Sequence, residues 1–218
     1  MIISPLHLTD GYKLDHRRQY PNNTTSVYSN FTPRSSRIPG IDKVVFFGLQ
    51  YFIIEFLCNQ YNNGFFKRDK DEVTKNYLRR INNYLGPNKI GIEHIEALHD
   101  LGYLPIRIKA LKEGSLVPIG VPMFTVQNTH KDFAWLTNYL ETLISCELWK
   151  PCVVATLAFE YRKNFEEHAK RTGYDPNFIQ WQGHDFSFRG MRGIYDAMKC
   201  SAAHLLSFTG TDTLPGID

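Results

Sequence analysis

The sequence lacks the features that mark several common classes of protein. Its four cysteines, Cys58, Cys146, Cys152 and Cys200, form no C-x-x-C pair and no zinc-finger spacing. We therefore expect free thiols in a reducing compartment and no bound metal. No run of consecutive apolar residues approaches the ~18 that a membrane span needs. The amino terminus has neither a basic region nor a small-residue cleavage site, so we predict no signal peptide and a cytoplasmic protein.

An excess of one charge is also missing. The 25 Lys and Arg residues nearly balance the 22 Asp and Glu residues, which leaves a net charge of +3. This balance argues against a nucleic-acid partner. Low-complexity segments and internal repeats are absent too, whereas 15 Phe, 12 Tyr and 3 Trp residues supply material for a core. The 218 residues are enough for one large domain or two small ones.

The pattern of apolar residues predicts an α+β arrangement in the first two thirds of the chain. Apolar and polar residues alternate, or apolar residues cluster, in four predicted strands: Thr25–Thr32, Val44–Phe47, Ile106–Ala110 and Pro122–Val126. Helical spacing predicts helices over Leu49–Cys58, Asp71–Leu85, Glu93–Leu101 and Phe133–Leu148, and a further helix with Pro151 at its first position. Asn62-Asn63-Gly64 is typical of a turn.

The last forty residues predict a βαβ unit. Strands are expected over Phe178–Phe186 and His204–Phe208, on either side of a helix over Ile194–Ala203. Such a crossover makes the two strands parallel, so the turns that follow them lie at the same, carboxyl, edge of the sheet. In α/β folds that edge carries the ligand site.

Both turns contain polar residues that suit a binding site. The first holds His184-Asp-Phe-Ser-Phe-Arg-Gly190, and the second holds Gly210-Thr-Asp-Thr213. An aromatic face, a guanidinium and a carboxylate that meet there can hold a flat heterocycle with an amide beside an anion. Each turn alone is weak evidence, and Asp212 by itself is equally typical of a helix N-cap.

Several motifs in fixed order give the chain a resemblance to nicotinamide phosphoribosyltransferases, from about Leu8 to Thr213. The motifs are Asp10-Gly-Tyr-Lys13 with His16 and Gln19-Tyr-Pro21, Phe46-Phe-Gly-Leu-Gln-Tyr51, Leu104-Pro-Ile-Arg-Ile-Lys-Ala110, Phe124-Thr-Val-Gln-Asn-Thr129, Trp135-Leu-Thr-Asn-Tyr-Leu-Glu-Thr142, His184-Asp-Phe with Arg189-Gly190, and Gly210-Thr-Asp-Thr213.

The resemblance implies a type II phosphoribosyltransferase. Residues 1–150 would form a mainly antiparallel α+β domain that contributes to a dimer interface, and residues 151–218 would begin an α/β barrel that carries the pyridine-site loops. Family members condense nicotinamide with phosphoribosyl pyrophosphate to give nicotinamide mononucleotide and pyrophosphate in NAD salvage. They work as homodimers with a shared active site. Mg²⁺ arrives with phosphoribosyl pyrophosphate, and ATP is a possible coupling substrate of the full-length enzyme.

The resemblance also implies roles for individual residues. Phe186 would stack on one face of the pyridine ring, and Tyr12 from the partner subunit would cover the other. Arg189 would reach the carboxamide or the diphosphate, Asp212 would accept the carboxamide N–H, and Arg34 would contact phosphate. Without the resemblance, Tyr12 is better explained as a core residue. Phe186 could then be an ordinary core aromatic at the end of a strand, and Arg34 a solvated arginine. His184 is expected to have a structural role beneath the site.

The predicted role of Asp212 favours an amide over an acid, because a nicotinate carboxylate beside it would be a like-charge contact. The chain departs from the family pattern at Ser187-Phe188 and at Met191-Arg-Gly193, where Arg192 is an added cation. The family's later phosphate-binding motifs do not occur before Asp218. We therefore expect a fragment or a truncated paralogue that is inactive by itself. Two alternatives stay open: a nicotinate-specific phosphoribosyltransferase, and a non-catalytic remnant that binds pyridines or dimerises.

Overall fold

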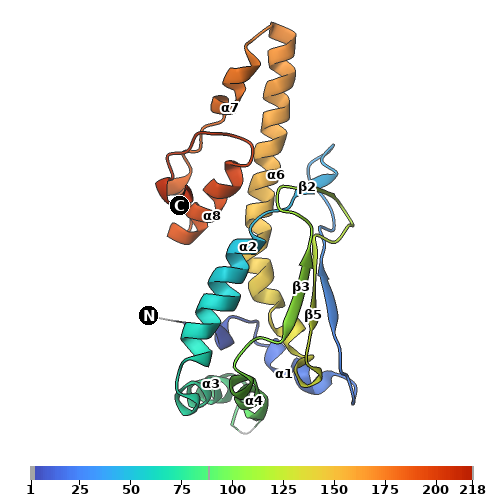
Figure 1. The fold of residues 1–218 in the computed structure, drawn as a ribbon, viewed down its shortest axis with the longest axis vertical. Coiled ribbons are helices and arrows are strands. Elements are labelled where there is room, and N and C mark those ends of the chain that lie inside the picture. Colours follow the sequence, from blue (N-terminus) through green and yellow to red (C-terminus); the bar gives the residue numbers. More distant parts are fainter. Residues whose placement is uncertain (1–2, 88, 218) are drawn as a thin grey trace. The chain divides into compact units, whose positions relative to one another are not determined.

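The computed structural model describes residues 3–87 and 89–217 (Figure 1). The elements follow in this order: η1 (Pro5–His7), α1 (Lys13–Gln19), β1 (Tyr28–Phe31), β2 (Lys43–Val45), α2 (Leu49–Phe52), η2 (Ile53–Gln60), η3 (Asn62–Phe66), α3 (Lys70–Leu85), α4 (Glu93–Leu101), β3 (Ile106–Ala110), β4 (Leu116–Pro118), β5 (Phe124–Asn128), η4 (Lys131–Phe133), α5 (Leu136–Tyr139), α6 (Glu141–Thr172), η5 (Pro176–Phe178), α7 (Ile179–Gln182), η6 (Phe188–Gly190), α8 (Ile194–His204) and η7 (Leu214–Gly216).

Contacts between residues divide the chain into two units that interleave along the sequence. Unit 1 comprises residues 1–31, 50–110 and 124–146, and unit 2 comprises residues 32–49, 111–123 and 147–218. The expected division of the chain at residue 150 stays a prediction.

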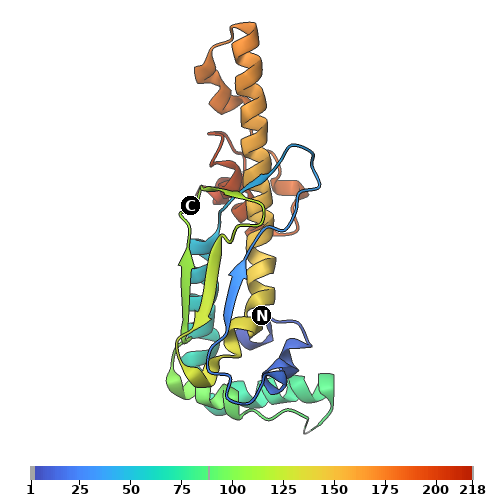
Figure 2. The same ribbon diagram turned by 90° about the vertical axis from the view of Figure 1, so that its right-hand side faces the viewer.

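Unit 1 contains an antiparallel sheet in the order β1-β5-β3, and the three strands lie side by side in Figure 2. Tyr28 pairs with Gln127 and Ile106 pairs with Asn128. Alternate residues of β5 are buried, as expected for a central strand with one face against a core. Asn128 is a buried polar residue, and its Oδ1 accepts a 2.8 Å hydrogen bond from the backbone N–H of Val27. Three of the predicted strands are thus present: β1 is shorter than predicted, β3 has the predicted bounds, and β5 begins two residues later than predicted.

Helices complete unit 1, and one of them corrects a predicted turn. After α2 the chain continues through two π-helical segments, η2 and η3, so Asn62-Asn63-Gly64 lies inside a helical segment. The turn prediction was wrong because Gly64 serves close packing: a Cβ there would lie 2.9 Å from Cδ of Pro5. Helices α3 and α4 match the predicted ranges closely. Asp69 caps α3 by accepting a 2.9 Å hydrogen bond from the N–H of Glu72.

Unit 2 is built on α6 and a small antiparallel pair, β2 with β4. Strand β4 was missed by the sequence pattern because it is a three-residue segment in a stretch rich in Gly and Pro. Val45, Ala155 and Ala203 form a buried cluster that joins β2, α6 and α8. The N–H of Val45 also donates a 2.9 Å hydrogen bond to Oγ1 of Thr156 on α6.

Pro151 does not begin a helix, contrary to the prediction. It lies inside α6, which runs without a break over 32 residues. A proline there removes one helical hydrogen bond and costs about 3 kcal/mol. Leu148 and Cys152, on either side of it, are fully buried, and such burial contributes about 1.5–3 kcal/mol for a large apolar side chain. Packing of the helix therefore offsets the local preference for a break.

The two strands predicted near the carboxyl end were also wrong as regular strands. Residues 176–182 form η5 and α7, and the segment after His204 is a series of turns. The predicted helix between them is present as α8. What remains of the expected sheet is a single parallel bridge between Asp185 and Thr211.

Among the described residues, α6 is long and apolar enough to cross a membrane by length and composition alone. The expectation concerned consecutive apolar residues, and charged residues interrupt the apolar runs of α6. Of the most apolar part of α6, 44% is buried inside the protein. Core helices have the same length and composition, and buried residues such as Leu148 and Ala155 contribute to the apolar character of α6.

Candidate functional site

The two polar loops of unit 2 lie against each other. The N–H of Asp185 donates a 3.0 Å hydrogen bond to the carbonyl of Gly210, and the N–H of Asp212 donates a 2.8 Å bond to the carbonyl of Asp185. The bridge is parallel and α8 forms the crossover between its two sides. The predicted juxtaposition of the loops is therefore present although the predicted strands are not.

His184 binds Asp212 directly. Its Nε2 lies 2.8 Å from Oδ1 of Asp212, and a carboxylate can only accept, so Nε2 carries the proton. The side chain of Asp212 is 62% exposed, and its second oxygen has no hydrogen bond from any described residue. The pair thus orients one carboxylate and leaves an acceptor open to a ligand. The expected structural role of His184 is therefore to orient the carboxylate of Asp212.

Gly210 permits this arrangement. A Cβ at this position would overlap Nδ1 of His184. Close approach of the two loops therefore requires glycine here. Gly183 has a similar role, since a Cβ there would lie 2.6 Å from the ring of Phe208.

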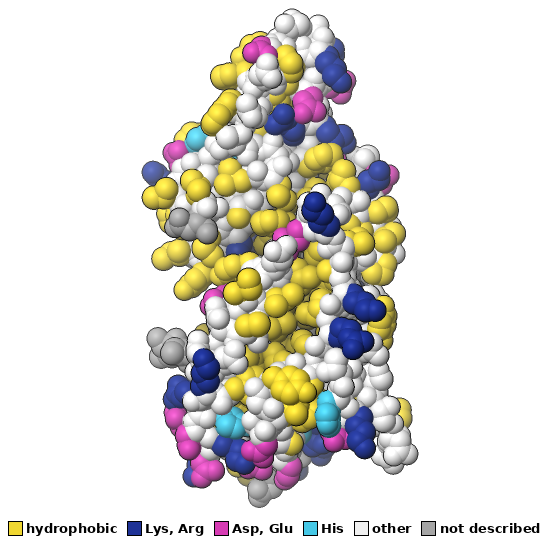
Figure 3. All heavy atoms as spheres, in the orientation of Figure 1, with side chains coloured by type: hydrophobic (Ala, Val, Ile, Leu, Met, Phe, Trp, Pro, Cys, Tyr) yellow, Lys and Arg dark blue, Asp and Glu magenta, His cyan; other side chains and the backbone are white. Residues whose placement is uncertain are grey.

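Phe186 and Arg189 extend from the same loop. The ring of Phe186 is 69% exposed, and its centroid lies 4.5 Å from that of His184. The ring is therefore not packed in the core of the described residues, and it has a face available for stacking. Arg189 lies in the short helix η6, is exposed, and forms no ion pair with a described residue. Hydrophobic side chains are frequent on the surface over α7 and α8 (Figure 3).

Asp185 was not singled out from the sequence, yet it is the buried group of the site. Its side chain accepts hydrogen bonds from Ser187, Thr211 and Thr213. Burial alone would raise the pKa of this carboxyl, but the hydrogen bonds from Ser187 and Thr211 outweigh it and lower the pKa to about 2. The signal available in the sequence was the pair of threonines that flank Asp212, whose hydroxyls need acceptors once they are buried.

Tyr12 lies in unit 1, directly before α1, and is 56% exposed. Its ring meets the ring of His16 edge-on at 4.9 Å, and Nζ of Lys13 lies 5.2 Å from its centroid. Lys13 is itself buried and pairs with Glu141, while Nδ2 of Asn138 lies 2.9 Å from Nδ1 of His16. Tyr12 is therefore not part of the core that the described residues form.

Arg34 is exposed in a loop of unit 2 and makes no hydrogen bond with a described residue. The preceding residue is fixed, because the carbonyl of Pro33 accepts a 2.8 Å bond from the N–H of Gly120. The structure thus links Asp212, Phe186 and Arg189 through one pair of loops, whereas Arg34 and Tyr12 lie on separate segments.

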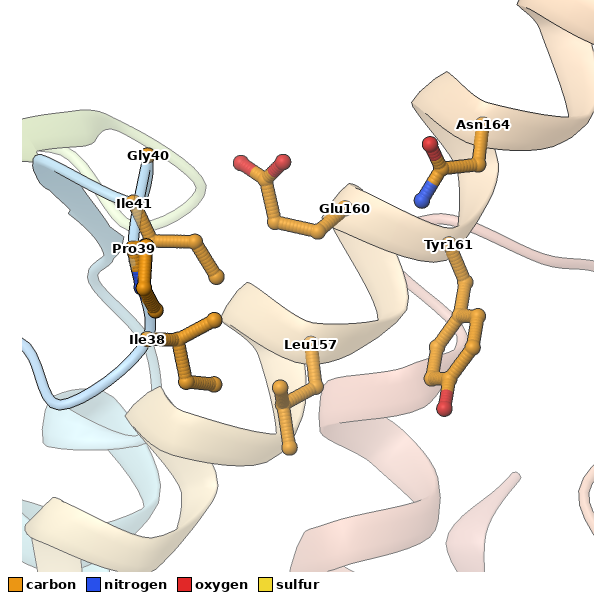
Figure 4. A pocket seen from close by; sticks show the side chains of 8 residues that line it. All are labelled: Ile38, Pro39, Gly40, Ile41, Leu157, Glu160, Tyr161 and Asn164. Carbon is orange, nitrogen blue, oxygen red and sulfur yellow. The ribbon is translucent and has the colours of Figure 1, made fainter.

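A separate hollow of about 410 Å³ lies between residues 38–41 and α6 within unit 2 (Figure 4). The side chains of Ile38 and Leu157 point into it, and Glu160 lies at its edge. It contains no cluster of chemically reactive groups. Across the described ranges, no group of three or more His, Cys, Asp or Glu side chains is arranged to hold a metal ion.

The sequence of this chain is similar to those of known proteins. Residues 4–108 match the family model described as nicotinamide phosphoribosyltransferase, N-terminal domain. A curated nicotinamide phosphoribosyltransferase of Acinetobacter baylyi is 54% identical over 99% of this chain and 44% of its own length. One of Mycoplasma genitalium is 32% identical over 96% of this chain and 49% of its own length.

The fold also matches a solved structure. Human nicotinic acid phosphoribosyltransferase superposes with a TM-score of 0.64 at 20% identity, over 96% of this chain and 37% of the human chain. At that identity the likeness shows the fold alone, and it confirms the expected phosphoribosyltransferase architecture. The chain spans less than half the length of the two curated relatives. Over nearly its whole length, this chain is similar to the amino-terminal part of nicotinamide phosphoribosyltransferases.

Proposed function

We propose that the protein condenses nicotinamide with phosphoribosyl pyrophosphate, giving nicotinamide mononucleotide and pyrophosphate in cytoplasmic NAD salvage. One observation carries this proposal: the loops of Phe186, Arg189 and Asp212 are fastened together in a chain that is 54% identical to a named nicotinamide phosphoribosyltransferase. Sequence similarity supplies the identity of the ligand, and the geometry supplies groups that suit it.

Each group has a task that its chemistry allows. The exposed ring of Phe186 offers a face on which a neutral pyridine stacks, which buries area and fixes orientation. The open oxygen of Asp212 accepts an N–H of the carboxamide. Arg189 is a free cation for the departing diphosphate, and Arg34 is a second candidate for phosphate contact.

The reaction itself needs positioning more than proton transfer. The pyridine nitrogen forms a bond to the anomeric carbon while the bond from that carbon to pyrophosphate breaks, and pyrophosphate leaves with the electron pair. Holding the ring in line therefore supplies much of the rate enhancement. Mg²⁺ enters as a complex with phosphoribosyl pyrophosphate and would stabilise the negative charge on pyrophosphate as it leaves. ATP is a proposed coupling substrate of the whole protein.

We also propose that the protein acts as a homodimer in which Tyr12 of one subunit covers the ring that Phe186 of the other subunit supports. The exposure of both aromatics supports this arrangement, because each has a face free for a ligand. Two aromatic faces bind one heterocycle more tightly than a single face does.

Replacement of Asp212 by Asn tests the proposed substrate. We expect kcat/KM for nicotinamide to fall at least about tenfold, since a charge-assisted hydrogen bond contributes about 1.5–3 kcal/mol. We expect nicotinate to be used relatively better, because the like charge is gone. The measurement is nicotinamide mononucleotide formation by the intact protein, with the same change at Asp175, which accepts a hydrogen bond from the N–H of Asn177 outside the site, as the control.

Undiminished turnover of nicotinamide by the Asp212→Asn variant would contradict the role of Asp212. Preference of the unmodified protein for nicotinate would favour the nicotinate-specific alternative instead. The human structural neighbour acts on nicotinic acid by its name, but the carboxylate of Asp212 disfavours that substrate here.

A further inference from the structure

Asp185 occupies a position unlike its neighbours in the loop. His184 and Phe186 have exposed side chains on either side of it, whereas Asp185 is 8% exposed. Its backbone makes both hydrogen bonds of the parallel bridge to the second loop. The side chain is therefore directed inward at the one point where the two loops are joined by their backbones.

The carboxylate of Asp185 bonds to both loops and is linked through Thr211 to α8. Oδ1 accepts a 3.0 Å hydrogen bond from the N–H of Ser187 in its own loop. Oδ2 accepts bonds from Oγ1 of Thr211 at 2.9 Å and Oγ1 of Thr213 at 3.1 Å in the other loop. Thr211 in turn lies 2.8 Å from Oγ of Ser201, which is fully buried on α8.

The residues that these bonds fix are the proposed ligand contacts. Phe186 lies between Asp185 and Ser187 in the chain, so the bond to Ser187 sets the turn from which its ring projects. Asp212 lies between Thr211 and Thr213, so the two hydroxyl bonds set the turn that presents its carboxylate. One buried carboxylate thus bonds to both the turn that carries the stacking face and the turn that carries the amide acceptor.

We propose that Asp185 is a positioning residue of the nicotinamide pocket, which holds Phe186 and Asp212 in a fixed relative placement by bonding to both loops. The ligand named here rests on the proposed function, whereas the fastening of the loops does not. Asp185 touches neither the substrate nor the reacting atoms, and acts only through its neighbours.

A charged carboxylate suits this task better than any neutral replacement. Both hydroxyls and the backbone N–H donate, so the site needs a group with two accepting oxygens and no donor. In Asp185→Asn, one oxygen would be replaced by an amide donor and the hydroxyls would have to turn away. Asp185→Ala removes all three bonds.

The test compares Asp185→Ala and Asp185→Asn with the same two changes at Asp175. Asp175 is a matched control, because its side chain accepts a 2.9 Å bond from the N–H two residues later, as Asp185 does, but makes no bond to the second loop. Thermal unfolding first establishes that each variant is folded. Thr213→Val provides a milder variant that removes one donor and keeps the shape.

Hydrogen exchange measures the fastening without any ligand. In Asp185→Ala we expect the amides of Ser187 and Asp212 to exchange at least about tenfold faster, with smaller increases in Asp185→Asn and Thr213→Val and none in the Asp175 variants. Exchange rates that stay unchanged in Asp185→Ala would overturn the inference, whatever the substrate is.

Kinetics of the intact protein measure the consequence for the pocket. We expect KM for nicotinamide to rise about tenfold in Asp185→Ala while KM for phosphoribosyl pyrophosphate changes less than about twofold. A parallel rise of both KM values, or loosened loops with an unchanged KM for nicotinamide, would overturn the positioning role. Absence of nicotinamide mononucleotide formation by the unmodified protein would instead overturn the proposed function, and hydrogen exchange would still decide whether Asp185 fastens the loops.

Discussion

At the scale of single residues, the candidate site depends on contacts so close that a larger side chain would not fit. His184 reaches Asp212 only because Gly210 has no side chain where the imidazole lies. Gly210 therefore affects the placement of Asp212 although it has no functional group of its own. Gly190, in the first loop, has open space around the position that a Cβ would occupy.

Replacement of Gly210 by Ala is expected to displace His184 and to release Asp212. Since the affected contact orients an acceptor of the proposed substrate, kcat/KM for nicotinamide should fall about tenfold to a hundredfold. Gly190→Ala is the matched control and should leave it within about twofold. A crystal structure of Gly210→Ala would show whether the imidazole has moved, and an unmoved His184 would refute the explanation.

At the scale of elements, α4 packs against the rest of unit 1 through a buried, neutral histidine. His94 is buried and meets the ring of Trp135 edge-on at 5.0 Å. Burial, together with the positive charge of Arg17, lowers the pKa of His94 to about 3. Nδ1 of His94 has no hydrogen-bond partner among the described residues. Protonation at this position is therefore unfavourable in the folded state.

The pH dependence of stability follows from this shift. In the unfolded chain the pKa of a histidine is about 6.5, so below that pH the unfolded state binds a proton that the folded state does not. The contribution of His94 is fully present above pH 6.5 and is lost toward pH 3, by about 1.4 kcal/mol per pH unit at most. Burial lowers the pKa of His7 as well, which acts in the same direction.

Urea unfolding at several pH values between 6.5 and 4 measures this slope. His94→Gln should be less stable at pH 7 but should show a flatter dependence on pH. The same substitution at His168, on an exposed turn of α6, is the control for the change itself. An unaltered slope in His94→Gln would show that another group causes the loss of stability.

At the scale of the whole molecule, unit 2 exposes more apolar surface than a pocket for one small ring requires. The exposed large side chains around α7 and α8 include Trp181, Phe186, Ile194, Tyr195 and Leu214. Exposed apolar side chains that gather on one surface are typical of places where another polypeptide segment packs. The proposed second subunit is one such segment.

Mixing two inactive variants tests the shared site. If Tyr12 and Asp212 of one site belong to different subunits, Tyr12→Ala and Asp212→Ala chains will each be impaired as homodimers. After denaturation and joint refolding, half of the dimers will be mixed, and each mixed dimer will have one intact site. Activity should therefore return to about a quarter of the unmodified value. No recovery would show that both residues act within the same subunit.

Much of the fold could be predicted because it depends on local pattern. Alternation in Ile106–Ala110 and helical spacing in α3 and α4 were sufficient, since one buried face imposes a fixed period. The motif order identified the family, and the two loops were correctly expected to meet. The roles of Tyr12, Arg34, Phe186, Arg189 and Asp212 stay predictions.

The sequence by itself indicated the similarity to the family, most element types of the amino-terminal part and the pair of loops that form the candidate site. Only the tertiary structure decided that Pro151 continues a helix, that Gly64 lies inside one, and that Asp185 is the buried link between the loops. The reason is physical. Local preferences at these positions amount to a few kcal/mol, and packing against residues distant in the sequence, or hydrogen bonds to them, contribute as much.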